Sequence, residues 1–535
     1  MKSEHLHGAL TAFCVGFLFL ASAGVWAQEA GAPTHIGVPQ DWSDHSLVFT
    51  LDGLARNPGL AEREPRIQHQ LMQRFPAANS NFFQGADAVS DPATTAGHHR
   101  DWNINLVRGR VAPNMSPAKY TYDPGAPPSC ANDYVVFGLN VAGKTAGQAN
   151  LIGVNNLYSG TGGLCGATPS VMFAYNITTS SGGYISVSPV ISLDGTKIAF
   201  VETLSSSIVF HVLTWTTGQG TIAKAAAPAS MTSLSFGATK STSSSPWIDY
   251  ENDAAYVAVD GGYIYKITGV FHGTPALSTD PWWPISISGG RITPPVLDSS
   301  LGLLMVGSRA GNLYQINVTN GAVATIPIGK GASIVAPPIV DVTNGTTFIV
   351  SSTNGHSAVL VETDTATLAN TITANIGLGG TSVTIPQPAF TNDYYLGLPD
   401  GQIRLCGTGA ADDTPWQYAF GFTGATLNVP PAFSQQLLTT TGASCTNWTE
   451  FYNPNVSGGT DFFFFGLTQD CTGSGTSGCV IAATTETSPL TTAAVDGGPS
   501  GIVIDNYSTA GQASSIYLTA ETGSTAYKFT QNGLQ

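Results

Sequence analysis

The chain has 535 residues, of which only 10% are charged, and its 34 acidic residues outnumber its 19 basic ones. The resulting net charge of −15 disfavours nucleic acid as a partner, because the field of the protein would repel phosphate. With 42% hydrophobic residues, 61 Gly and 32 Pro, the composition excludes a disordered chain and a coiled coil. It favours many short strands joined by tight turns.

The first 27 residues have the pattern of a secretory signal. Lys2 stands before an apolar run at residues 9–23, and the sequence VWA at 25–27 fits the small-residue cleavage rule. The alternative is an uncleaved membrane anchor, because residues 9–27 are just long enough to span a bilayer. We favour the signal, which predicts export to the periplasm or the cell exterior and no membrane span in the mature chain.

Residues 28–125 lack the repeat that follows and are predicted to form an N-terminal arm packed on the main domain. A charged segment at 55–75 is the candidate for a short helix, because apolar residues recur there at helical spacing. The sequence HHRDWNINL at 98–106 predicts a strand, which is a candidate to close the domain. For the adjacent His98 and His99 we favour a packing or surface role over metal binding, which would need a third ligand.

A loose repeat runs from residue 126 to residue 535. Its clearest copy, residues 293–323, predicts short strands at 295–297, 303–307 and 312–318 with turns between them. A four-stranded propeller blade takes roughly 40–50 residues. We therefore predict an all-β fold, a β-propeller of eight four-stranded blades, or seven if the degenerate first copy and the last copy share one blade. The prolines that begin the copies are Pro128, Pro189, Pro246, Pro295, Pro338, Pro388, Pro431 and Pro499.

The copy at 293–323 resembles the β-propeller repeat of pyrroloquinoline-quinone-dependent dehydrogenases and their non-enzymatic relatives. Two features of the quinone enzymes are missing, because no tryptophan follows the last turn of this copy and no two cysteines are adjacent in the sequence. The whole chain also resembles uncharacterised exported propeller proteins of soil bacteria. These likenesses imply a quinoprotein-like propeller fold and leave the activity open. The motifs that carry them are TPPV at 293–296, VGS at 306–308, GNLY at 311–314, TNG at 319–321, DWS at 41–43 and HHRDW at 98–102.

Six cysteines remain after the signal, and an even number in an exported chain favours disulfides. Cys471 and Cys479 are the first expected pair, because the flexible loop between them joins two strand-like runs. The second expected pair is Cys130 with Cys165, and Cys406 with Cys445 follows by elimination. Six cysteines allow fifteen pairings in principle.

Acidic residues recur near the end of the first strand of each copy. They could form an acidic ring at one mouth of the channel, but we favour a role in turns, since Asp readily accepts hydrogen bonds from nearby backbone. Asp249, Glu251 and Asp253 form the densest cluster and are the candidate calcium ligands. The recurring residues are Asp194, Asp249, Asp298, Asp341, Asp393 and Asp505.

Two aromatic segments have alternative interpretations. Trp282 and Trp283 are the candidate ligand-binding residues, as an aromatic platform for a sugar, although packing between blades is the favoured interpretation. The phenylalanine run at 462–465 predicts a buried strand, because an exposed run of this kind would promote aggregation.

No local motif of a zinc protease, an α/β-hydrolase or a phosphate-binding loop occurs in the sequence. We therefore favour an exported, non-catalytic propeller that acts as a binding or scaffold module for a protein or a glycan. No cofactor is predicted, and calcium is the one candidate ion. The alternative is a propeller enzyme, either a quinone-type oxidoreductase or a glycan-active enzyme, because an active site assembled from separate blades need not show a local motif.

Overall fold

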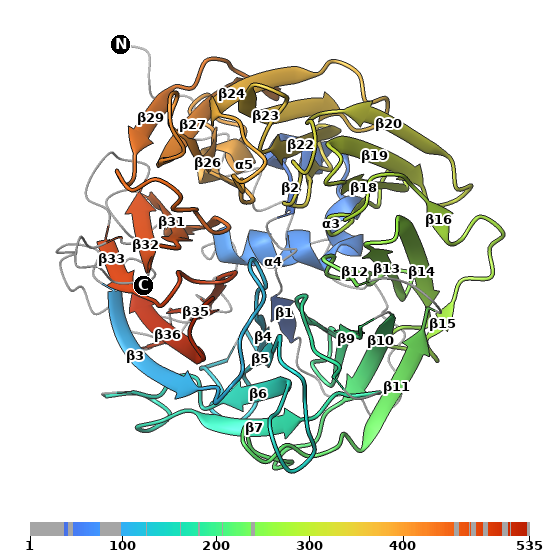
Figure 1. Cartoon of the computed structure of the whole chain (residues 1–535), viewed down its shortest axis with the longest axis vertical. Helices are drawn as coiled ribbons and strands as arrows, with labels where there is room; N and C mark the ends of the chain where they lie inside the picture. Colours follow the sequence, from blue (N-terminus) through green and yellow to red (C-terminus); the bar gives the residue numbers. More distant parts are fainter. Residues whose placement is uncertain are drawn as a thin grey trace.

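The computed structural model describes residues 37–40, 46–74 and 98–531, except residues 125, 161, 180–181, 206, 237–240, 454–458, 470, 472–477, 485–490, 506–511 and 514. The described strands form eight sheets, which stand side by side around a central axis (Figure 1). This confirms the predicted all-β propeller of eight blades, and the first and last copies of the repeat form separate blades. Within each blade the strands follow one another outward from the axis in chain order, and three sheets gain one more strand from the N-terminal part of the chain.

Blades one to four follow one another along the chain. Blade one contains β4 (Ala118–Thr121), β5 (Tyr134–Gly138), β6 (Leu151–Asn155) and β7 (Ser170–Tyr175). Blade two contains β8 (Val190–Ile191), β9 (Lys197–Thr203), β10 (Ile208–Thr214) and β11 (Ser230–Ser235). Blade three contains β12 (Trp247–Asp249), β13 (Ala254–Val259), β14 (Tyr263–Thr268), β15 (Ala276–Leu277) and β16 (Ile285–Ser286). Blade four contains β17 (Val296–Asp298), β18 (Leu303–Gly307), β19 (Asn312–Asn317) and β20 (Val323–Pro327).

Blades five to eight complete the ring. Blade five contains β21 (Ile339–Asp341), β22 (Thr346–Ser351), β23 (Ser357–Asp364) and β24 (Ile372–Leu378). Blade six contains β25 (Ala389–Phe390), a short helix α5 (Asn392–Leu396), β26 (Gln402–Thr408), β27 (Pro415–Thr423), β28 (Thr426–Leu427) and β29 (Phe433–Gln436). Blade seven contains β30 (Thr449–Asn453), β31 (Thr460–Leu467), β32 (Cys479–Thr484) and β33 (Thr491–Ala494). Blade eight contains β34 (Val503–Asp505), β35 (Ser515–Thr519) and β36 (Thr525–Gln531).

The ring is closed by a strand from the N-terminal arm. β3 (His98–Asn105) pairs antiparallel with β36 and so becomes the outermost strand of blade eight. This agrees with the strand predicted at 98–106. The segment 28–125, predicted as an arm, also contains β4, which pairs with β5 in the sheet of blade one. The domain boundary at residue 126 therefore cuts through that blade.

The prolines were predicted to mark the start of each repeat. This prediction is correct for the blades in the middle of the chain and wrong for two of the prolines. Pro189, Pro246, Pro295, Pro338 and Pro388 each precede the first strand of a blade directly. Two other prolines lie elsewhere: Pro128 is in the loop between β4 and β5, and Pro431 precedes β29 at the periphery of blade six. Blade seven begins at β30 without a proline, since a strand start tolerates proline but does not require it.

The remaining part of the arm that the structure describes contains two short strands and three short helices. β1 (Val38–Gln40) pairs with β4 of blade one, and β2 (Leu47–Val48) pairs in parallel with β21 of blade five. The single helix expected at 55–75 is divided into α2 (Leu51–Arg56), α3 (Gly59–Arg63) and α4 (Pro65–Arg74). Proline stands at the first position of α4, where the missing N–H costs no helical hydrogen bond. Within the described residues, no helix combines the length and apolar character needed to cross a membrane.

Apolar residues fill the space between blades. The run at 462–465 lies in β31, and Phe463, Phe464 and Phe465 are completely buried, as predicted. All three predicted disulfides are present, with Cα–Cα distances of 5.4 Å for Cys130–Cys165, 6.2 Å for Cys406–Cys445 and 5.8 Å for Cys471–Cys479. The first of these joins the loop between β4 and β5 to the loop between β6 and β7.

Candidate functional site

The centre of the ring is occupied by the protein's own arm. α4 lies across the axis, from blade three on one side to blade seven on the other (Figure 1). These two blades face each other in a ring of eight. A helix of ten residues is about 15 Å long, so α4 spans the channel as a rod. Its two ends carry the arginines of the helix, Arg66 and Arg74.

Arg74 fixes one end of α4 to blade seven. Its guanidinium forms two parallel contacts with the Glu450 carboxylate, at 3.1 Å and 2.5 Å, and lies 3.5 Å from the centre of the Tyr395 ring. A two-pronged arginine–carboxylate pair is among the strongest ionic contacts in proteins. Burial, together with the charge of Glu450 and a hydrogen bond to it, raises the pKa of the neighbouring Asp461 to about 8. This end of the channel therefore holds two carboxyl groups beside one arginine.

Arg66 fixes the other end to blade three. The guanidinium lies 4.0 Å from the centre of the Trp247 ring and donates to the backbone carbonyl of Ile248 at 3.0 Å. Its charge is balanced within the arm, because Nη1 lies 2.9 Å from Glu64 Oε1. Burial raises the pKa of Glu64, and Arg66 opposes that rise.

Two further contacts connect α4 to the arm strands. The side chains of Gln40 in β1 and His69 in α4 are 2.9 Å apart, and Gln70 donates to the carbonyl of Leu47 in β2 at 3.0 Å. Since β1 belongs to the sheet of blade one and β2 to that of blade five, α4 is connected to four blades at right angles to one another. The N-terminal arm therefore fills the centre of the ring and is held there by contacts with the surrounding blades.

One mouth of the channel is formed by the inner turns, which we define as the turns joining the first and second strands of blades two to six, at 193–196, 250–253, 299–302, 342–345 and 392–401. α2 lies against this mouth, because Thr50 donates its N–H to Thr343 Oγ1 at 2.8 Å. Among the inner turns, Leu301 and Leu398 are 43% and 48% exposed. The mouth therefore presents the exposed apolar side chains of Leu301 and Leu398 together with α2.

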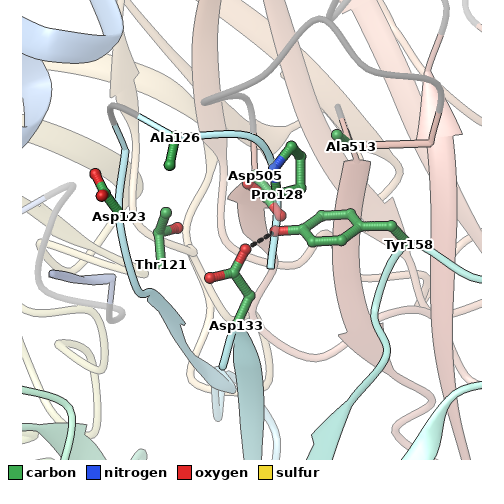
Figure 2. Close-up of a pocket in the computed structure, with 8 residues that line it drawn as sticks. All are labelled: Thr121, Asp123, Ala126, Pro128, Asp133, Tyr158, Asp505 and Ala513. Atoms are coloured by element: carbon green, nitrogen blue, oxygen red, sulfur yellow. Dashed lines mark hydrogen bonds between the residues drawn. The ribbon is translucent and has the colours of Figure 1, made fainter. Parts of the chain in front are cut away.

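A small cavity lies at the seam between blade one and blade eight. Figure 2 shows Asp133 and Tyr158 of blade one pointing toward each other, with Asp505 of blade eight beside them. Tyr158 donates to Asp133 at 2.5 Å. The volume open to the centre of a water molecule is about 10 Å³, which suits one water rather than a quinone or a sugar.

Buried ion pairs surround this cavity. Lys119 Nζ lies 2.8 Å from Asp505 Oδ1, and both side chains are almost fully inaccessible to solvent. Behind them, Lys528 Nζ lies 3.1 Å from Asp101 Oδ2, which brings β3 into the same network. Burial lowers the pKa of Lys528, and Asp101 opposes this fall. Burial likewise raises the pKa of Asp133, with Lys119 opposing the rise. These charges join the two ends of the ring.

The candidate calcium ligands lie at the end of β12 and in the inner turn of blade three, and the carboxylates of Asp249 and Asp253 accept hydrogen bonds from nitrogen donors. Asp249 accepts from the backbone and side-chain nitrogens of Asn252, at 3.1 and 2.8 Å. Asp253 accepts from the backbone N–H groups of Phe271 and His272, at 2.6 and 3.0 Å. Glu251 is exposed. Within the described part of the chain, no three His, Cys, Asp or Glu side chains are placed to share a metal ion, and calcium binding stays an untested prediction.

The other recurring aspartates also accept hydrogen bonds within turns. Asp298 accepts from the backbone of Ser300 and Leu301, at 3.0 and 3.1 Å, and Asp341 accepts from the backbone of Thr343 and Asn344, at 2.8 and 2.9 Å. The same pattern holds at Asp194. The turn interpretation of these residues therefore has direct structural support. Two positions differ, since Asp393 lies in α5 and Asp505 is part of the seam.

The candidate aromatic platform is packed between blades three and four. Trp283 is 8% exposed and contacts Tyr256, with ring centres 5.7 Å apart. Trp282 is partly buried and lies against Gly321, where any side chain would overlap it. Binding of a sugar here stays an untested prediction. His98 and His99 lie in β3, and their side chains lie outside the described part of the structure.

Comparison with known proteins identifies no family. No family model matches the chain, and no curated protein matches it. Among solved structures, BamB from Moraxella catarrhalis matches at 13% identity over 81% of this chain and 99% of that chain, with a TM-score of 0.45. The Dos1 propeller matches at 11% identity over 81% of this chain and 95% of that chain, with a TM-score of 0.49. Neither likeness bears on the ligand or activity of this protein.

Proposed function

We propose that the protein is an exported binding or scaffold module that holds a protein or a glycan at the mouth formed by its inner turns. The observation that carries the proposal is the occupied channel. Arg66 and Arg74 anchor α4 at opposite blades, where the Ile248 carbonyl and the Glu450 carboxylate are engaged in holding the arm. A ligand would then bind the loops around the mouth, as loops on a rigid scaffold commonly do. Three disulfides suit the oxidising compartment that export implies.

Exposed apolar side chains at this mouth provide a way to test the proposal. The mature protein is labelled and offered to a glycan array and to envelope proteins of the cells that produce it. We expect the double substitution Leu301→Asp and Leu398→Asp to weaken binding at least about tenfold, equivalent to 1.4 kcal/mol. Val323→Asp is the matched control, because Val323 is 44% exposed but lies on the peripheral strand β20.

The enzyme alternative makes a different prediction. A quinone-type oxidoreductase should show an orderly red shift when titrated with quinone and calcium, followed by turnover in a dye-linked dehydrogenase assay. A glycan-active enzyme should release sugar from a polysaccharide. We expect neither result, and either one, if abolished by substitutions around the channel, would contradict the binding-module proposal.

A further inference from the structure

A lysine and an aspartate on the two strands that close the ring are in direct contact inside the protein. Lys528 is on β36 and Asp101 is on β3, and Nζ lies 3.1 Å from Oδ2. Both side chains are completely inaccessible to solvent. A primary amine and a carboxyl group are the two reactants of an amide bond, and lysine can supply a neutral amine because its pKa shifts readily on burial.

A β-bulge places the two groups on the same face of the sheet. Arg100 pairs with Phe529, and Trp102 pairs with the next residue along β36, Lys528. Asp101 is therefore an extra residue on β3, between the two pairs. Bulges re-aim side chains, and this one coincides with the direction of the Asp101 carboxylate toward Nζ.

Both reacting groups have polar partners that also suit the amide product. Nζ of Lys528 donates to the backbone carbonyl of Gln512 at 2.5 Å, and Oδ2 of Asp101 accepts from the Thr530 hydroxyl at 2.5 Å. In an amide between the two side chains, the nitrogen keeps one N–H and the carbonyl keeps one oxygen. The N–H can still donate to Gln512, and the oxygen can still accept from Thr530.

Burial favours the reaction and protects its product. Burial lowers the pKa of Lys528, against the opposing charge of Asp101. This favours the neutral amine, which is the nucleophilic form of lysine. A buried ion pair carries a large desolvation penalty, whereas a hydrogen-bonded amide has no charge to bury. Exclusion of water also shields the amide from hydrolysis.

The closure of the ring has no disulfide to secure it. The three disulfides join residues 35, 39 and 8 positions apart, and none of them includes a residue of β3 or β36. Across these two strands, Asp101 and Thr530 are 429 residues apart in the chain. A covalent link that closes so long a loop restricts the unfolded chain more than a link within one blade does.

We propose that Lys528 and Asp101 form an intramolecular isopeptide bond once the chain has folded, and that this bond closes the ring covalently. Nζ of Lys528 bonds to Cγ of Asp101, and the bond from Cγ to Oδ1 breaks. Two protons of the ammonium pass to Oδ1, which leaves as water, and the third stays on the amide nitrogen. No oxidant or other reactant is needed.

The reaction takes place once in each chain and within the buried pair, so no substrate has to enter and no proton has to be exchanged with bulk water. The neighbouring seam cavity has room for one water molecule. It is lined by Tyr158, whose ring centre lies 5.9 Å from Lys528 Nζ. The site is separate from the inner turns and does not depend on ligand binding there.

The test is mass spectrometry of the full mature protein, which is incubated in the folded state and then denatured and reduced. We expect the intact mass to be lower by one water than the sequence requires. A protease digest should contain a branched peptide that joins Asp101 to Lys528. On a denaturing gel, the reduced chain should migrate ahead of Lys528→Arg, because the bond keeps the unfolded chain closed as a loop.

Two variants separate the bond from a simple ion pair. Lys528→Arg keeps the cation but has no amine to condense, so it should show the full mass. Lys266→Arg is the matched control, because Lys266 pairs with Asp280 at a partly exposed position, and it should still lose one water. A loss of water that persists in Lys528→Arg, or that maps to Lys119 and Asp505, would overturn the proposal.

The wild-type protein decides the matter even if Lys528→Arg does not fold. Unmodified Asp101 and Lys528 in linear peptides from the folded, incubated wild type would show that the contact is an ion pair only, and would overturn the proposal.

Discussion

Two interfaces between neighbouring blades differ in chemistry. Between blades four and five, Gly307 of β18 approaches Ile334 and Ile349, which belong to a cluster of buried apolar side chains. Between blades eight and one, the seam contains the buried pair Lys119–Asp505 together with Asp133, and the buried pair Lys528–Asp101 joins β36 to β3 within blade eight. The first interface joins consecutive segments of the chain. The second joins segments more than 380 residues apart, which the sequence numbers of Lys119 and Asp505 show directly.

The difference has a physical reason. Consecutive blades are already held near each other by a short connection, so non-directional apolar packing is enough to join them. The ends of the ring have no such connection and must recognise each other among eight similar sheets. A buried charge left without its partner is strongly unfavourable, and this penalises wrong pairings more than apolar packing does. We therefore attribute the charged seam to correct ring closure.

The largest expected effect is at the seam. Lys119→Met leaves Asp505 buried without its cation and should lower the free energy of unfolding by about 3–5 kcal/mol, measured by guanidinium denaturation. Lys266→Met is the control, because its partner Asp280 is 3.4 Å away and both side chains are partly exposed. That change should cost less than about 1 kcal/mol.

Adding Asp505→Leu to Lys119→Met gives a stricter test of the same comparison. If the charges provide specificity rather than stability, replacing both should restore most of the lost free energy, because no unpaired charge remains. The double variant should also misfold or oligomerise more often on refolding, which light scattering detects. A double variant as unstable as the single one, with refolding unchanged, would contradict this account of the seam.

A second expected effect lies at the Arg74 end of α4. The pKa of Asp461 is raised to about 8 from an ordinary value of 3.8, so the folded state binds a proton that the unfolded state releases. Stability should therefore be highest below about pH 4 with respect to this group, and should fall as the pH rises toward 8. Because of this group, the free energy of unfolding should fall by on the order of 1 kcal/mol per pH unit between pH 5 and 7. Asp461→Asn should flatten it, whereas Asp52→Asn, exposed on α2, should not.

The sequence predicted the parts of the fold that depend on local pattern. Loosely recurring prolines and turn residues indicated eight blades, and residues 98–106 were predicted to form a strand that could close the domain. The prediction from proline positions failed where the local sequence could not show the place of a strand in its sheet. Pro431 precedes a peripheral strand and has the same local sequence surroundings as a proline that precedes an inner strand. Only the pairing of β29 with β27 distinguishes the two.

The sites were less predictable than the fold. The charged segment at 55–75 was expected to be helical, but its position across the channel depends on Trp247 and Glu450, more than 170 residues away. In blade two, Ser233 on β11, His211 on β10 and Glu202 on β9 form a hydrogen-bonded row that the linear sequence does not reveal, because its members are 9 and 22 residues apart. Their contact follows only from the register of three strands. A search for polar residues at opposed positions of predicted hairpins could have found it.

A smaller effect is expected at the hairpin disulfide. Cys471 and Cys479 close a loop with a sequence separation of 8, so replacing both by Ser should cost about 2 kcal/mol or less. Replacing Cys130 and Cys165, with a separation of 35, should cost more on the same chain-entropy argument. Denaturation of the two double variants measures the difference. Mass spectrometry of the unreduced digest checks the pairing, and a peptide linking Cys471 to Cys445 would refute it.

The smallest expected effect is at the inner turn of blade three, where calcium was the candidate ion. Four nitrogen donors already occupy the oxygens of Asp249 and Asp253, and a calcium ion would have to replace them. We therefore expect millimolar calcium to leave the Tm unchanged. A calcium ion that binds the folded state, present at a concentration 100 times its Kd, would instead add about 2.7 kcal/mol to the free energy of unfolding. Glu251→Ala should change stability by no more than about 0.5 kcal/mol, with or without calcium, because the side chain is exposed. A calcium-dependent rise in Tm that Glu251→Ala removes would show that the turn rearranges into an ion site.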